Sequence, residues 1–174
     1  MKNSHLGAAA VLVAGFLHGC LNAPIVSPTP ISSTRKSAKN VVSRANFIAL
    51  KWQRSGGYTG IQTQMLVHNG SVTLHNGAPD NKKPSQNKTL TQAEFQRVLK
   101  ALNDAKFIQI VGRYSTPGMS DGFSDVVTLV LQTPGEKPRS FVVDSYGDAA
   151  PKAFYALITS LKTLKNQKFA DGRN

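Results

Sequence analysis

The dipeptide Asn69-Gly70 is the feature that most limits the folds open to this chain. Both central positions of a two-residue type I′ hairpin turn need positive φ, and Asn-Gly supplies them at little steric cost. Apolar and polar residues alternate on both sides, from Ile61 to His68 and from Ser71 to His75. A two-residue turn pairs Val67 with Val72 on the apolar face, so the turn and the pattern predict one register.

Further strands and two helices are predicted around this hairpin. Strand patterns cover residues 45–54, 126–131 and 140–144, and the second of these is apolar enough to be buried on both faces. Thr91 and Glu94 form a capping box at the start of one helix, and Asp148 can cap the other. Both helices carry an apolar stripe at helical spacing: Phe95, Val98, Leu99 and Leu102 in the first; Phe154, Leu157, Ile158, Leu161 and Leu164 in the second.

These elements predict an α+β domain over residues 45–165. Local hairpins favour a single antiparallel sheet of four to five strands, with two helices packed mainly on one face. The polar stretch 76–88 and the glycine-bearing stretch 112–122 are predicted loops. Residues 166–174 are predicted to be a flexible tail.

Residues 1–19 have the character of a secretory signal: a charged start, then a short apolar run that is too short to span a bilayer. They end in Leu17-His18-Gly19-Cys20, which resembles the lipobox of bacterial lipoproteins. That resemblance implies lipidation at Cys20 and a lipid anchor in the cell envelope, in the outer membrane because leucine follows the cysteine. The alternative is an ordinary signal peptide that is cleaved near Ala23.

Residues 20–44 are predicted to be a tether. They are rich in proline, serine and threonine, and their charges, at Arg35, Lys36, Lys39 and Arg44, are all basic. Such a segment cannot bury enough surface to fold, and it either adheres to anionic lipid or remains a solvated linker. The chain carries a formal charge of +12. Its basic residues are scattered and do not alternate with aromatic ones, which disfavours a nucleic-acid partner.

Enzyme signatures are weak. Residues 118–122, Gly-Met-Ser-Asp-Gly, match the nucleophile-elbow pattern, but a strand rather than a helix is predicted after Ser120 and no histidine follows it. Beyond the tether the histidines are His68 and His75, which the hairpin register keeps apart, so neither a metal site nor a cofactor is predicted. Cys20 is the only cysteine, which leaves the domain without a thiol nucleophile. We therefore expect a non-enzymatic protein.

Residues 50–61, LKWQRSGGYTGI, resemble the entry motif of the emfourin-like inhibitors of thermolysin-type metallopeptidases. The resemblance continues through the predicted helix, Thr116-Pro117-Gly118, the run Asp121-Gly122-Phe123 and the final helix. Two features depart from the pattern: Asp125 stands where a tyrosine is expected, and the 76–88 loop is long. The resemblance implies inhibition of a secreted or envelope metallopeptidase through Ser55, Gly56, Gly57, Tyr58, Thr59, Gly60, Asp121 and Phe123.

The residues themselves leave two interpretations open. Glycines at 56, 57 and 60 let the backbone approach a partner closely, and Tyr58 would be a rigid contact residue. The same glycines could instead form a bulged turn, with Tyr58 packed on a helix. The competing function is that of an envelope adaptor or structural lipoprotein that uses this fold to bind another protein.

Overall fold

A computed structural model of the chain describes residues 41–57, 60–77, 84–120 and 122–170, which belong to one compact unit. The leader, Cys20 and the tether as far as residue 40 lie outside the described residues. The elements, in chain order, are β1 (Phe47–Gly56), β2 (Ile61–His68), β3 (Ser71–Asn76), β4 (Gln86–Thr89), α1 (Gln92–Asp104), the 3₁₀ turn η1 (Phe107–Gln109), β5 (Gly112–Ser115), β6 (Phe123–Leu131), β7 (Arg139–Tyr146) and α2 (Lys152–Phe169).

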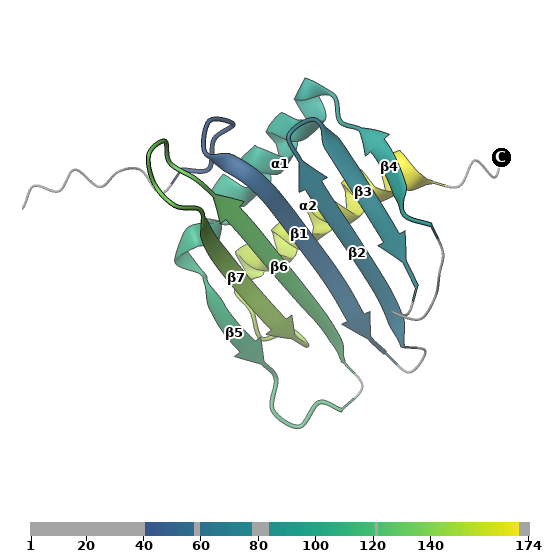
Figure 1. Cartoon of the computed structure of the whole chain (residues 1–174). Helices are drawn as coiled ribbons and strands as arrows, with labels where there is room; N and C mark the ends of the chain where they lie inside the picture. The colour runs from purple at the N-terminus through teal and green to yellow at the C-terminus, as the bar shows by residue number, and fades with distance from the viewer. Residues whose placement is uncertain (1–40, 58–59, 78–83, 121, 171–174) are drawn as a thin grey trace, which may run out of the picture. The chain divides into compact units, whose positions relative to one another are not determined.

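The sheet has seven strands in the order β4-β3-β2-β1-β6-β7-β5 (Figure 1). The α+β class is therefore confirmed, but four to five antiparallel strands is wrong. β4 extends the sheet beside β3 inside the stretch predicted as a loop, and β5 pairs with β7 in parallel inside the other predicted loop. Both are four-residue edge strands whose residues are mostly exposed, so no apolar alternation marks them.

The hairpin register is confirmed. Val67 pairs with Val72 and Met65 with Leu74, and all four side chains are buried on the face that the helices cover. Gly70 has the positive φ, 84°, that the turn requires. Alternation also governs β6, whose odd-numbered residues from Asp125 on are buried and whose even-numbered residues are half-buried. The prediction that this strand is buried on both faces was wrong, because both helices of the described part of the chain, α1 and α2, lie on the same face of the sheet (Figure 1).

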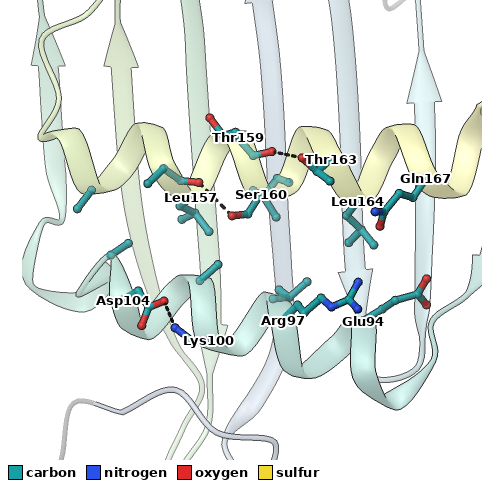
Figure 2. Close-up of a pocket in the computed structure, with 16 residues that line it drawn as sticks. Glu94, Arg97, Lys100, Asp104, Leu157, Thr159, Ser160, Thr163, Leu164 and Gln167 are labelled. Carbon is teal, nitrogen blue, oxygen red and sulfur yellow. Dashed lines mark hydrogen bonds and ion pairs between the residues drawn. The ribbon is translucent and has the colours of Figure 1, made fainter.

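α1 and α2 cross the strands on that single face (Figures 1 and 2). The predicted apolar stripes of both helices are entirely buried, and they pack with the inward residues of the sheet in one core. Trp52, Phe107 and Phe154 are the largest of its fully buried side chains. Within the described residues, the opposite face of the sheet carries no helix.

The capping box at Thr91 is present: its hydroxyl accepts from the Glu94 amide, and its amide donates to the Glu94 carboxylate. The prediction that Asp148 caps α2 was wrong: the N-cap residue is Pro151, and no side chain caps the helix. The fold also reaches beyond the predicted boundaries of 45 and 165. Val42 is buried in the core, and α2 continues to Phe169.

Candidate functional site

The two glycine-bearing connections meet at one end of the sheet, which we call the loop end. There the β1–β2 connection leaves Gly56, which pairs with Ile61 on one side and with Phe123 at the start of β6 on the other. The Gly57 amide donates a hydrogen bond across to the Gly122 carbonyl, at 3.4 Å. Because β1 and β6 are neighbours in the sheet, stretches more than sixty residues apart in sequence share one surface.

Contacts at the loop end require two of the glycines. Gly56 has φ of 108°, and a Cβ there would lie 2.5 Å from the Gly122 carbonyl oxygen. Gly57 has φ of 72°, and its Cβ would lie 2.8 Å from the edge of the Phe123 ring. L-residues rarely adopt such φ values, and a Cβ cannot occupy space already held by a carbonyl. Backbone and ring therefore touch directly here.

The face of the Phe123 ring is held by a chain of polar contacts that begins in the core. The buried Trp52 indole donates to Asp125 Oδ1 at 2.9 Å. Arg54 donates to Asp125 Oδ2 at 2.8 Å, and its guanidinium carbon lies 4.3 Å from the centre of the Phe123 ring. Arg54 therefore binds a carboxylate and a ring face at once, as its planar cation favours. The Phe123 ring is therefore in contact with Gly57 at its edge and with Arg54 over its face.

Asp125 is thus a structural residue of this surface. It is 6% exposed, whereas Phe123 is 37% exposed. The resemblance led us to expect a tyrosine at position 125, but the residue is an aspartate, and each of its two carboxylate oxygens accepts a hydrogen bond. Sequence reasoning missed Arg54 and its role. The alternation of β1 gave a signal, because Arg54 shares the inward face with Trp52, and an inward charge needs a partner.

Two described residues of the β5–β6 connection, Ser120 and Gly122, are hydrogen-bonded to Tyr146 of β7. The Tyr146 hydroxyl donates to the Ser120 carbonyl at 2.9 Å and accepts from the Gly122 amide at 3.2 Å. Met119, which is 39% exposed, lies against Gly122 and Gly147. The loop end therefore presents two exposed apolar side chains, Met119 and Phe123, beside main chain that is hydrogen-bonded to Tyr146.

The remaining predicted site residues are distributed as follows. Gly60 is exposed in the turn, and its amide donates to the Gly57 carbonyl at 3.0 Å. Ser55 is half-buried, and it pairs with Ser124 on the uncovered face of the sheet rather than on the face of Phe123. Tyr58, Thr59 and Asp121 lie outside the described residues, so their predicted contacts stay predictions.

The structure adds little to the weak enzyme signals. Ser120 precedes a strand, as expected, and its carbonyl is taken by Tyr146. His68 pairs with Ser71 and His75 with Gln64, in the predicted register. Across the described ranges, no three His, Cys, Asp or Glu side chains are grouped so that they could hold a metal ion.

Comparison with models of known protein families and with curated proteins returned no match to this chain. Among the helices that the structure describes, none combines the length and the apolar character needed to cross a membrane. The loop end is therefore assigned on its own geometry.

Proposed function

We propose that the domain binds a thermolysin-type metallopeptidase through the loop end and inhibits it, while a lipid on Cys20 anchors the protein in the bacterial cell envelope. The observation that carries the proposal is the junction of Gly56, Gly57, Gly122 and Phe123, where two connections from distant parts of the chain form one exposed, braced surface.

A protease cleft accepts extended main chain with side chains that enter adjacent pockets. The loop end offers main chain with little side-chain bulk at Gly56 and Gly57, beside the exposed Phe123 ring. Bracing by Arg54 lowers the conformational entropy lost on binding, which is the usual advantage of a preorganised inhibitor loop. A braced connection is also hard for the enzyme to move into the geometry of hydrolysis, so it would act as an inhibitor rather than a substrate.

The proposal is tested by hydrolysis of a peptide substrate by thermolysin-type enzymes in the presence of the purified full chain in nonionic detergent. We expect slowed hydrolysis that recovers on dilution, with the chain intact on a denaturing gel. Unchanged hydrolysis by several such enzymes at high concentrations of the chain would rule the proposal out.

One observation favours the adaptor function as the second candidate. The sheet face opposite the helices carries mostly uncharged polar side chains. Gln53, Gln64, Thr73 and Thr128 are among them, and all four are half-buried. A broad uncovered face of this kind can receive another protein. Substitutions on this face would then abolish binding to an envelope component, and substitutions at the loop end would not.

A further inference from the structure

One flank of α2 carries lysines that no acid in the helix balances. The helix, Lys152–Phe169, contains four lysines and neither aspartate nor glutamate. Lys168 is already paired with Glu94 of α1, at 2.8 Å. Lys162 and Lys165 appear in none of the ion pairs or hydrogen bonds found among the described residues, and both are half-buried.

The helix phase places Lys162 and Lys165 on the side of α2 that faces the loop end. Lys162 follows Tyr155 by seven residues and lies about 20° from it around the helix. Lys165 follows Tyr155 by ten residues and lies about 80° from it, on the side of the buried stripe and away from the groove between the helices. Tyr155 fixes the direction of this flank, since its hydroxyl bonds the Ser145 hydroxyl at 2.8 Å and donates to the Gly147 carbonyl at 2.8 Å. The opposite flank, with Ser160 and Leu164, borders the groove between α2 and α1 (Figure 2).

The row of the sheet beneath this flank is known from the register. Ser145 pairs with Asp125, Asp125 with Arg54, and Arg54 with Thr63, so one line crosses β7, β6, β1 and β2. α2 runs across the strands from β7 toward β4 (Figure 1). Its rise of about 1.5 Å per residue carries it about 10 Å from Tyr155 to Lys162 and about 15 Å to Lys165.

Strands lie about 4.8 Å apart, so β1 is about 10 Å and β2 about 14 Å from β7. Lys162 therefore lies at the level of β1 and Arg54, and Lys165 at the level of β2. Asp125 is the only acid in the row, and its carboxylate already binds Arg54. Lys162 and Lys165 therefore place two positive charges beside the loop end, whereas the charge of Arg54 is balanced by Asp125.

We propose that Lys162 and Lys165 form a basic ledge beside the loop end, and that the ledge docks against an acidic protein surface that borders the partner's cleft. The inference rests on the proposed function, because it specifies the partner that the loop end binds. Charges at the rim of an interface chiefly accelerate association, and they do so less as salt screens them. The ledge is thus a steering device that brings Phe123 to the cleft.

The test is the association rate of the full chain with a thermolysin-type peptidase, taken from the onset of inhibition. It is run in nonionic detergent at about 0.01 M and about 0.3 M salt, where screening lengths are about 30 Å and below about 8 Å. The variant is Lys162→Glu with Lys165→Glu. The control, Lys88→Glu with Lys137→Glu, makes the same change of net charge at two exposed positions remote from the loop end.

We expect the ledge variant to associate about tenfold more slowly than the unmodified chain at low salt, with the difference shrinking at high salt. The control should change the rate much less. If circular dichroism shows that the glutamate variant is poorly folded, Lys162→Gln with Lys165→Gln replaces it. We expect this variant to slow association in the same way, but by less. Equal rates for the glutamine variant and for Lys88→Gln with Lys137→Gln, which changes the net charge equally, would overturn the ledge alone if inhibition is intact. If the unmodified chain inhibits no such peptidase, both the ledge and the proposed function fail.

Discussion

Replacement of Asp125 by alanine should lower the free energy of unfolding by about 2–4 kcal/mol. The Trp52 indole N–H would lose its acceptor at a site that is 1% exposed, and an unsatisfied buried donor costs about 1–3 kcal/mol. Arg54 would lose its ion pair, but its side chain is 24% exposed and can turn to water, which limits that share to about 1 kcal/mol. Asp125→Asn keeps an acceptor for the indole, so about 1–2 kcal/mol is expected for it.

The assay is urea unfolding followed by the fluorescence of Trp52, the only tryptophan in the chain. Ser124→Ala is the matched control, because it changes the neighbouring residue on the other face of β6 and removes only a long 3.4 Å hydrogen bond to Asp144 Oδ1, so it should cost about 1 kcal/mol at most. A loss below about 0.5 kcal/mol for Asp125→Ala would refute the reasoning that the carboxylate connects the core to the loop end.

Three further substitutions test separate contacts. Glu94→Gln should lower the free energy of unfolding by about 1–2 kcal/mol. The hydrogen bond from Lys168 and the capping bonds lower the Glu94 pKa from 4.5 to about 2, so the contribution of Glu94 to stability is complete above about pH 4.5 and is lost as pH falls toward 2. The free energy of unfolding of the variant should therefore depend less on pH in that window than that of the unmodified chain. Asn103→Ala removes two 2.8 Å hydrogen bonds to the Val42 main chain, so amide exchange at Val42 should accelerate markedly; unchanged exchange would contradict that role. Tyr155→Phe removes a hydroxyl with three partners and should lower the free energy of unfolding by about 1–3 kcal/mol in urea titrations; a neutral result would show that water replaces those bonds.

Elements that bury a periodic apolar face could be predicted from the sequence. The β2–β3 register followed from Asn69-Gly70, and the buried stripes of α1 and α2 followed from helical spacing. β4 and β5 could not be found in this way, because the free edges of β3 and β7 recruit them and their own side chains are mostly exposed. Likewise, the start of α2 is set by Pro151 and not by the cap that Asp148 offered.

The candidate site, too, could be predicted only in part. Glycines 56 and 57 could be selected from the sequence, since few structures need consecutive glycines between strands. Their contact with Gly122 and Phe123 depends on β1 and β6 being neighbours, and no local pattern states that pairing. Arg54 and Asp125 were overlooked as a pair because their side chains meet only once that pairing is known.

The inhibition constant of the Phe123→Ala chain, measured beside Val142→Ala, tests the central claim most directly. The two side chains are almost equally exposed, 37% and 38%, but only Phe123 lies at the loop end. Loss of an anchor residue from an interface typically costs 2 kcal/mol or more, so inhibition of a thermolysin-type peptidase should weaken about thirtyfold for Phe123→Ala. Val142→Ala should inhibit as the unmodified chain does. Equal inhibition by the two variants would contradict a binding surface at the loop end.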